Sequence, residues 1–265
     1  NNVIEVYGEN NGIEGDISSA IRLEKVSNVA NRNICIKENL LKIYSTYLCF
    51  GGYPLAVNIS GCRDDIFSVL TGNTVYEKEN ERSIVAVLCS DGLHDDITFS
   101  DAFKEYAVIK GGIYIPENHT LTVDPGTTVY FYGSLGNAYY HPEVYAFEVA
   151  GTLNLLGTEK NAIKISRMYD LDWSYLYFDN RSFNGHWGYF LGIYVQKTGL
   201  FHGEHLEIPF INAIDDPRFR VEGQLILRDS TIYSCDELFA RKSPVLYLDT
   251  SIAPIIENCE FLFVN

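Results

Sequence analysis

Two short stretches of the sequence hold residue types that can perform hydrolytic or metal chemistry. Asp215 and Asp216 form a carboxylate pair, and the run 202–205 (His-Gly-Glu-His) brings two imidazoles close to a carboxylate. Glycoside cleavage needs two carboxyl groups held apart across one bond, whereas adjacent strand residues point to opposite faces. Pro217 follows the acidic pair and favours a turn. We therefore predict a solvated turn at Asp215 and Asp216 and no catalytic pair.

The two histidines give a similar answer for metal binding. On a strand, positions i and i+3 face opposite sides, so His202 and His205 do not share a ligand set, whereas His202 and Glu204 lie on one face. We predict that they are surface or corner residues. The sequence contains no Gly-x-Ser-x-Gly elbow, phosphate-binding loop or G-x-G-x-x-G motif. These observations predict a protein that is not an enzyme.

The elements that would position such residues are short strands separated by tight turns. Residues 120–131 and 150–158 each alternate apolar and polar positions on either side of a glycine turn. The triplet Asp124-Pro125-Gly126 predicts a corner, because proline fixes φ and glycine accepts a positive φ. Recurrence of such units is typical of coils stacked in parallel into a β-solenoid.

Residues 120–131, 150–158 and 160–166 together resemble the first coils of right-handed parallel β-helices. Strand signals recur from Ala107 to the end of the sequence, and at roughly 22 to 30 residues per coil this segment holds about five or six coils. Residues 227–232 and 256–261 align as successive coils, which places Asp229 and Asn258 at one corner and stacks Cys259 on Ser230. A bridge between Cys235 and Cys259 stays open. Because the sequence ends without a polar cap, we expect the β-helix to be truncated and to continue past residue 265.

Charge and composition limit the partners and the compartment. The net charge of −15 disfavours nucleic acid and anionic lipid surfaces, and no apolar run is long enough to insert into a membrane. Six cysteines and three glycosylation sequons, at Asn58, Asn118 and Asn180, fit an oxidising setting. We therefore expect an extracellular segment of a cell-surface or secreted protein, with disulfide bonds and attached glycans.

Four cysteines cluster before residue 90, namely Cys35, Cys49, Cys62 and Cys89. Without a C-x-x-C pair they favour disulfides over zinc. Their surroundings, including residues 47–53 and 84–90, resemble a scavenger receptor cysteine-rich (SRCR) domain. We thus predict a mainly β chain with a small SRCR-like α+β domain at 1–95 and a right-handed single-stranded parallel β-helix at 96–265.

The SRCR resemblance implies one disulfide, Cys49–Cys89, and leaves Cys35 and Cys62 either paired with each other or free. It also implies a calcium site, but Lys37 stands near the family's acidic positions and would repel the ion. Asp64 and Asp65 remain weak cation candidates, with a solvated turn as the alternative. We expect no cofactor, with calcium as the one ion to test.

An aromatic segment interrupts the rhythm of the coils between residues 169 and 187. It sets aromatic side chains beside carboxylates, as in loops that bind a protein or a glycan. The alternative is that these aromatics belong to the core or cover an open side of the solenoid. The candidate partner-binding residues are Trp173, Tyr175, Tyr177 and Phe178.

An SRCR-like module followed by a β-helix resembles the extracellular unit of Bark beetle (Anakonda)-type transmembrane proteins of tricellular junctions. The resemblance implies a non-enzymatic adhesion or scaffold module at epithelial junctions that binds a protein partner, with a second copy of the chain as one candidate. The alternative is a secreted carbohydrate-active enzyme, of the pectate lyase or polygalacturonase kind, with an accessory SRCR-like domain. A scavenger receptor for polyanions is disfavoured by the negative charge.

Overall fold

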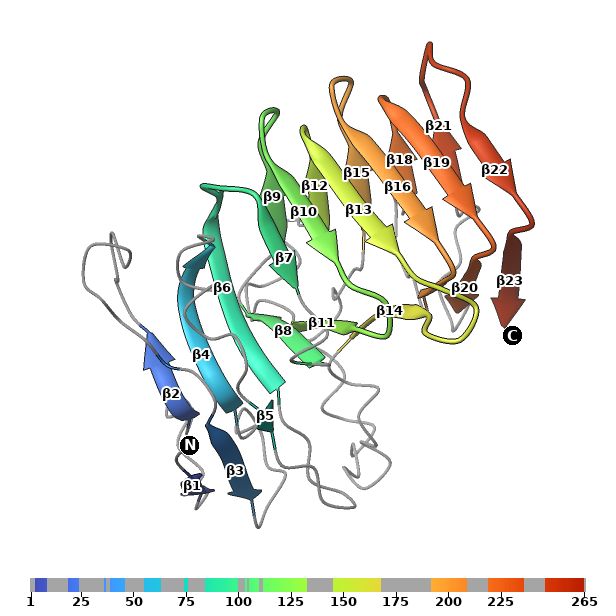
Figure 1. Cartoon of the computed structure of the whole chain (residues 1–265). Helices are drawn as coiled ribbons and strands as arrows, with labels where there is room; N and C mark the ends of the chain where they lie inside the picture. The colour runs from blue at the N-terminus through green and yellow to red at the C-terminus, as the bar shows by residue number, and fades with distance from the viewer. Residues whose placement is uncertain are drawn as a thin grey trace, which may run out of the picture.

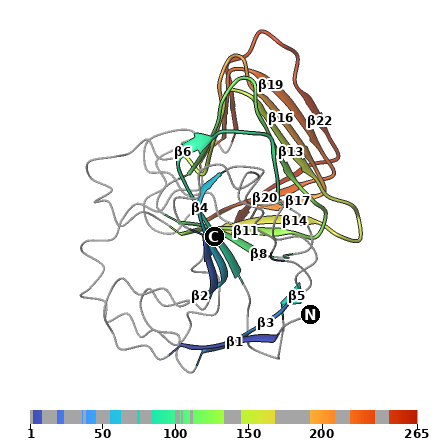
Figure 2. The ribbon, with the colours of Figure 1, turned by 60° about the vertical axis from the view of Figure 1, so that its left-hand side comes forward.

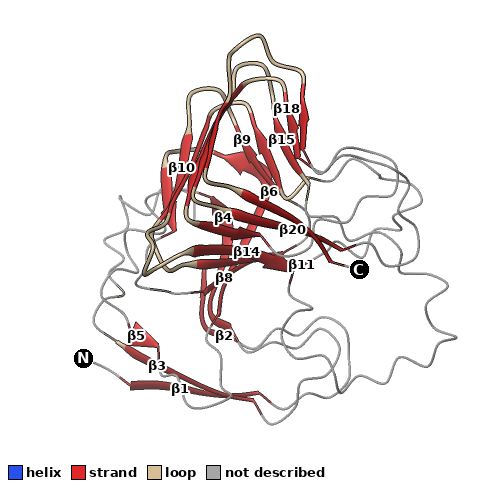
Figure 3. Cartoon of the chain, turned by 90° about the vertical axis from the view of Figure 1, so that its right-hand side faces the viewer, coloured by secondary structure: helices blue, strands red, loops and turns tan. Residues whose placement is uncertain are grey.

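The fold is an all-β stack of short parallel strands. The computed structural model describes residues 3–8, 19–23, 36, 39–45, 55–62, 74–75, 84–99, 103, 105–109, 112–132, 145–167, 192–208, 219–235 and 246–264. These residues contain strands and turns but no helix (Figure 3). The predicted mainly β class is therefore confirmed.

Three parallel sheets run along the stack. The six-stranded sheet contains β7 (Ile97–Phe99), β10 (Thr120–Val123), β13 (Thr152–Leu156), β16 (Leu200–Glu204), β19 (Gln224–Arg228) and β22 (Ile255–Glu257). The five-stranded sheet contains β9 (Ile113–Ile115), β12 (Phe147–Val149), β15 (Ile193–Val195), β18 (Phe219–Val221) and β21 (Leu246–Leu248). The nine-stranded sheet contains β2 (Ser19–Leu23), β4 (Leu55–Cys62), β6 (Ile84–Leu93), β8 (Glu105–Ile109), β11 (Thr128–Tyr132), β14 (Ile163–Arg167), β17 (Leu206–Ile208), β20 (Thr231–Cys235) and β23 (Glu260–Val264).

From β9 onward, each coil passes through the five-stranded, the six-stranded and then the nine-stranded sheet. The strands β9, β10 and β11 form one such coil, and β18, β19 and β20 form another. Figure 1 shows the strands of successive coils side by side, and Figure 2 shows their turns lying over one another. Because every pairing between coils is parallel and nearly in register, residues at equivalent positions form columns along the solenoid.

Coil length varies more than the sequence indicates. Glu204 and Arg228 meet on neighbouring coils and are 24 residues apart. Glu148 and Gln196 also meet on neighbouring coils but are 48 residues apart. The longer coil includes residues 168–191, which lie outside the described part of the chain. The strands therefore keep a constant geometry while the connections between them differ in length.

The core fills the space between the three sheets with columns of apolar side chains. Strands alternate buried and half-buried residues, as the apolar alternation of the sequence predicts. One column is formed by the buried residues Leu121, Leu153, Phe201 and Leu225. The Phe201 ring packs edge-on against Phe219 with centroids 5.0 Å apart. Gly203 takes the next inward place because a Cβ there would come within 2.5 Å of Leu206 Cδ1.

The corner predicted at Asp124-Pro125-Gly126 is confirmed. Gly126 has a φ of 81° and its N–H donates to the carbonyl of Asn161, while Thr127 N–H donates to Asp124. The turn joins β10 to β11 and directs the chain from the six-stranded to the nine-stranded sheet. The glycine is needed because side chains resist a positive φ.

The nine-stranded sheet crosses the domain boundary predicted between residues 95 and 96. Strand β6 lies before that position and β8 after it, and the two pair in parallel from Val85–Tyr106 to Val87–Val108. A separate three-stranded sheet of β1 (Val3–Gly8), β3 (Leu40–Ser45) and β5 (Thr74–Val75) is also parallel. The described strands before residue 95 pair in parallel. They do not confirm the predicted SRCR-like α+β domain.

Candidate functional site

Many of the residues predicted to form a site lie outside the described part of the chain. These are Cys35, Cys49, Asp64, Asp65, Trp173, Tyr175, Tyr177, Phe178, Asn180, Asp215 and Asp216. The backbones of Cys62 and Cys89 lie in β4 and β6, where Cys62 is in register with Leu93. The proposed Cys49–Cys89 bridge and the cation site stay predictions.

The glycosylation sequons fall in two different settings. Asn118 is exposed in the turn between β9 and β10, where His119 N–H donates to the Pro116 carbonyl at 3.0 Å. Asn58 lies within β4, with its backbone in register with Arg22 and Ala86. The turn at Asn118 is the more open of the two backbones, because β4 has a neighbouring strand on each side.

The histidine cluster is arranged as the strand periodicity predicts. His202 and Glu204 share the outer face of β16, with His202 Nε2 3.0 Å from Glu204 Oε1. His205 follows at a corner with a φ of 48° and lies 4.0 Å from Asp229, measured from Nε2 to Oδ2. The two imidazoles therefore have different carboxylate partners. No group of three metal-ligating side chains occurs among the described residues.

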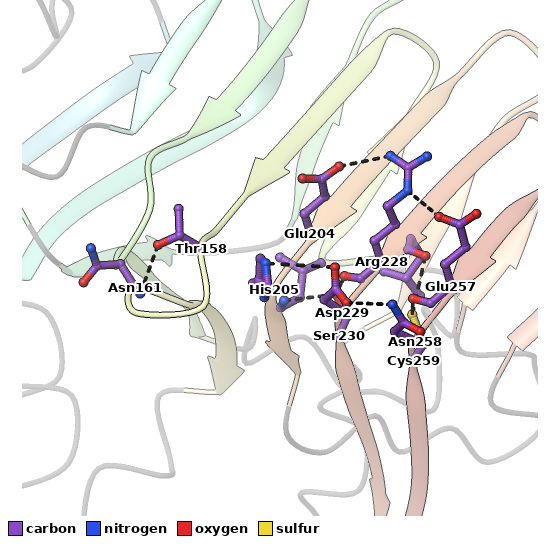
Figure 4. A network of polar contacts seen from close by, with 12 residues as sticks. Thr158, Asn161, Glu204, His205, Arg228, Asp229, Ser230, Glu257, Asn258 and Cys259 are labelled. Carbon is purple, nitrogen blue, oxygen red and sulfur yellow. Dashed lines mark hydrogen bonds and ion pairs between the residues drawn. The ribbon is translucent and has the colours of Figure 1, made fainter.

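Three successive corners form a column of polar residues in left-handed conformation (Figure 4). His205, Asp229 and Asn258 have φ values of 48°, 49° and 53°. Asn258 Nδ2 donates to Asp229 Oδ1 at 3.1 Å across the coil interface. Asparagine and aspartate accept this conformation more readily than other side chains. The predicted corner at Asp229 and Asn258 is confirmed.

A second column on the six-stranded sheet alternates acid and base. Arg228 donates from Nη1 to Glu204 Oε1 at 3.2 Å and from Nε to Glu257 Oε2 at 2.8 Å (Figure 4). The hydrogen bond with His202, followed by that with Arg228, holds the pKa of Glu204 below its usual value. The hydrogen bonds with Glu257 and Glu204 raise the pKa of Arg228. Arg228 therefore joins Glu204 and Glu257 across three successive coils.

Cys259 is a free thiol that stacks on Ser230, as the alignment of the last coils predicts. Its Sγ lies 3.2 Å from the Glu257 carbonyl, and the Ser230 hydroxyl donates to the Arg228 carbonyl at 2.6 Å in the coil before. Each side chain thus contacts the carbonyl two residues before it, at the equivalent turn of its own coil. Strand register pairs Cys235 with Val264, so Cys235 and Cys259 do not form the bridge that the sequence left open. Burial raises the pKa of the Cys259 thiol.

The five-stranded sheet carries a column of residues that the sequence reasoning missed. The central residues of its strands are in register: Tyr114, Glu148, Tyr194, Arg220 and Tyr247. We call this set the tyrosine column. In the first four strands this residue points outward between two buried apolar residues, whereas in β21 the flanking Leu246 is half-buried and Leu248 is exposed. Aligning the repeated apolar-x-apolar triplets of the sequence would have found it, because the central residue of such a triplet points away from the core.

Polar contacts fix the middle of the tyrosine column. The Arg220 guanidinium lies over the Tyr194 ring, 5.3 Å from its centroid, and donates to Glu222 Oε1 at 2.6 Å. On the neighbouring coil, Gln196 Nε2 donates to Glu148 Oε1 at 2.6 Å. Burial, then the charge of Glu222, raises the pKa of the Tyr194 phenol. The hydroxyl therefore stays protonated at neutral pH and is hydrogen-bonded to the Glu222 carboxylate, and the Tyr145 ring lies 5.2 Å from the Tyr194 ring, measured between centroids.

The ends of the tyrosine column are open. Tyr114 is 39% exposed and Tyr247 is 42% exposed, whereas the inward neighbours Ile113 and Ile115 are fully buried. Aromatic side chains that are rigidly held and partly exposed provide binding area at a small cost in conformational entropy. The described surface thus has two kinds of outer column: a salt-bridged one that holds the coils together, and an aromatic one with free area.

Comparison of the chain with known protein families, with curated proteins and with solved structures found no match. The described strands define a mainly β protein of stacked parallel sheets with a solenoid-like fold. Within the described ranges, no helix is long and apolar enough to span a membrane.

Proposed function

We propose that this chain is a non-enzymatic, extracellular adhesion or scaffold module of a larger cell-surface protein, and that it acts at epithelial junctions through contacts with a protein partner. The observation that carries the proposal is the chemical contrast between the two outer columns. The acidic residues Glu204 and Glu257 are both hydrogen-bonded to Arg228, whereas Tyr114 and Tyr247 of the tyrosine column offer exposed aromatic area. Aromatic residues and arginine are enriched where proteins bind one another.

A stack of coils is a stiff support for such a surface. Each coil contacts its neighbours through parallel strands in three sheets, so residues that are far apart in sequence are held along a single line. We take the coils to wind in the right-handed sense, since connections between parallel strands of one sheet are nearly always right-handed. The SRCR resemblance of residues 1–95 stays a prediction, and the parallel strands described there favour a continuation of the solenoid.

The rival function, cleavage of a polysaccharide, requires carboxylates that converge on one bond. The described carboxylates closest to a candidate histidine are Glu204, on the outer face of β16, and Asp229, at a corner, and each has a partner of its own. The proposal is therefore tested by two measurements on the secreted, glycosylated chain: release of reducing sugar from a panel of polysaccharides, and sedimentation equilibrium with and without calcium.

We expect no sugar release from any polysaccharide in that panel. Self-association in the centrifuge would identify a second copy as the partner, and dependence on calcium would revive the site at Asp64 and Asp65. Turnover of any one polysaccharide, abolished by a single carboxylate substitution, would overturn the proposal in favour of the enzyme.

A further inference from the structure

The outer face of the five-stranded sheet already binds one cation of its own. The Arg220 guanidinium lies 5.3 Å from the centroid of the Tyr194 ring and donates to Glu222 Oε1 at 2.6 Å. The Tyr194 hydroxyl is hydrogen-bonded to the same carboxylate, and the Tyr145 ring lies 5.2 Å from the Tyr194 ring, measured between centroids. A tyrosine ring and a neighbouring carboxylate therefore bind a guanidinium on this face, and the chain itself supplies that guanidinium.

A second tyrosine of the same column lies beside a carboxylate. Tyr114, at the centre of β9, is in register with Glu148 of β12. Neighbouring parallel strands lie about 4.8 Å apart, so a group held over the Tyr114 ring is within reach of the Glu148 side chain. Within the described ranges, Arg220 is the one cation that lies over an aromatic ring. Tyr114 and Glu148 therefore provide the ring and the carboxylate of the internal site, and no described residue supplies the cation.

Both groups are held in position by their neighbours. Gly92, near the end of β6, has a φ of 81°, and a Cβ at that residue would lie 3.0 Å from Tyr114 Cδ1. The glycine thus lets the ring lie against the backbone, while Tyr114 stays 39% exposed. Gln196 Nε2 donates to Glu148 Oε1 at 2.6 Å, which orients the carboxylate and leaves Oε2 as a second acceptor. A ligand at this place meets groups that are already oriented, which lowers the entropy cost of binding.

The charges around Tyr114 attract a cation. Glu148 neighbours the ring, and Glu117 is exposed in the turn after β9. The side chain of Asp96, which accepts a hydrogen bond from the first N–H of β10, is 72% exposed. The turn after β15 adds one exposed cation, Lys197. Since the whole chain carries a net charge of −15, a basic side chain is favoured at this place and an acidic one is repelled.

An arginine suits the pair of Tyr114 and Glu148 better than a lysine does. The planar guanidinium stacks on an aromatic face and donates to a carboxylate in a fixed fork, whereas the ammonium of lysine is a strongly hydrated point charge. Arg220 adopts the first arrangement on the same sheet. Arginine and tyrosine are also enriched among the residues that dominate the binding energy of protein interfaces.

We propose that Tyr114 and Glu148 form a docking site for an arginine side chain of a partner protein, with the guanidinium over the Tyr114 ring and hydrogen-bonded to the Glu148 carboxylate. The inference rests on the proposed function and deepens it, because it names the kind of residue through which a protein partner binds this surface.

The test titrates the whole chain, with isotope-labelled tyrosine rings, against two short peptides and follows the ring signals by NMR at low ionic strength. One is a blocked glycine-arginine-glycine peptide. In the other, citrulline replaces arginine, which keeps nearly the same shape but removes the charge. Tyr114→Phe assigns the Tyr114 signals. We expect these signals to shift to a plateau with the arginine peptide, and the citrulline peptide to bind at least about threefold more weakly. Equal binding of the two peptides, or no response at Tyr114, would overturn the proposal.

Tyr194 provides an internal control. Its ring contacts Arg220 and Tyr145, so its signals should respond to neither peptide in the wild-type chain. In Arg220→Ala the internal cation is removed, and we expect the Tyr194 signals to respond to the arginine peptide. Thermal melts show whether this variant is folded. A folded Arg220→Ala chain whose Tyr194 signals do not respond would show that a ring and a carboxylate are not sufficient here, and would overturn the proposal.

The carboxylate is tested by a matched pair of substitutions. Glu148→Gln keeps an acceptor for Gln196 but removes the charge, and we expect it to weaken binding at Tyr114 about threefold. Glu159→Gln removes the same charge from an exposed turn and should leave binding unchanged. Equal weakening by the two substitutions would mean that the net charge of the chain attracts the peptide, and would overturn the assignment to this site.

Adhesion of beads coated with the chain separates this site from the function on which it rests. If the beads adhere to epithelial cells through a protein but Tyr114 does not respond to the arginine peptide, the proposed function stands and the docking site is wrong. If Tyr114 responds while the beads do not adhere, the docking site stands and the junctional function fails.

Discussion

Arg228 donates a hydrogen bond from Nε to Oε2 of Glu257 at 2.8 Å, across the interface between two successive coils. The same guanidinium reaches back to Glu204 on the coil before. One side chain therefore links three coils on the outer face of the six-stranded sheet. Because these side chains are about one-third exposed or more, we expect solvent and salt to screen the interaction, so its effect on stability is smaller than that of a core residue.

The dependence of thermal stability on pH in the acidic range tests the contacts of Glu204. His202 and Arg228 hold the pKa of Glu204 below 4.5, its ordinary value, so the stabilisation by Glu204 is complete above that pH and is lost as the pH falls through the lowered value. We predict that Glu204→Gln lowers Tm at neutral pH and that the difference from wild type shrinks as the pH falls below the ordinary pKa of a glutamate. Glu159→Gln, in an exposed turn, is the matched control. A Tm difference that stays constant with pH would contradict the prediction.

The left-handed corner makes a prediction about backbone strain. Asp229 has a φ of 49°, which a β-branched side chain resists. We predict that Asp229→Val destabilises the fold by about 1–2 kcal/mol, because the left-handed conformation carries a cost of that size. Asp229→Gly should lie closer to wild type, since glycine offsets the lost hydrogen bond by relieving the strain. Urea unfolding of the two variants compares them, and equal destabilisation would argue against a strained corner.

The core column makes the largest prediction. Phe201 is fully buried and packs edge-on against Phe219. Phe201→Ala should destabilise the chain by about 3–5 kcal/mol through lost burial and the cavity left behind. Ile252→Ala, at an exposed position, should change stability by less than about 0.5 kcal/mol. Urea midpoints measure both, and a Phe201→Ala variant as stable as wild type would place the residue outside the core.

The thiol of Cys259 should react, but slowly. It is free, and burial raises its pKa, so the thiolate that reacts is scarce at neutral pH. We predict that iodoacetamide labels Cys259 in the folded chain more slowly than in urea, by at least about tenfold. Peptide mapping by mass spectrometry without reduction gives both rates. A peptide in which Cys259 is joined to another cysteine would contradict the structure.

Glycosylation at Asn118 tests the predicted compartment. The side chain is exposed in a turn between two strands, which leaves it open to a glycosyltransferase. When the chain is secreted from animal cells, we expect a glycan at Asn118 that is lost in Asn118→Gln. Intact mass before and after enzymatic deglycosylation measures it. An unmodified Asn118 in a chain that is secreted and glycosylated elsewhere would show that the turn is covered.

The sequence predicted the turns and the alignment of successive coils better than it predicted where the stacked parallel strands begin. The turn at Asp124-Pro125-Gly126 and the stacking of Cys259 on Ser230 followed from residue types, because corners tolerate few side chains and successive coils align by their apolar positions. The parallel strands before residue 95 could not be told apart from strands of another fold, since an apolar run such as that of β6 fits several kinds of sheet.

The candidate surface was harder to predict than the core. The five triplets that hold the tyrosine column are separated by connections of different length, so their outward residues come together only when the register is known. The apolar residues on either side of the triplet centre show the strand periodicity. The central Tyr, Glu or Arg cannot be distinguished in the sequence from other exposed residues. Register, which depends on contacts across whole coils, decides which polar side chains meet.

Adhesion of beads coated with the secreted chain to epithelial cells tests the central claim most directly. The account predicts that the beads bind, that protease treatment of the cells abolishes binding, that removal of cell-surface glycans does not, and that Tyr114→Ala reduces binding while Ile252→Ala leaves it unchanged. Beads that fail to bind, or whose binding survives protease but is lost when glycans are removed, would contradict a module that works through protein contacts.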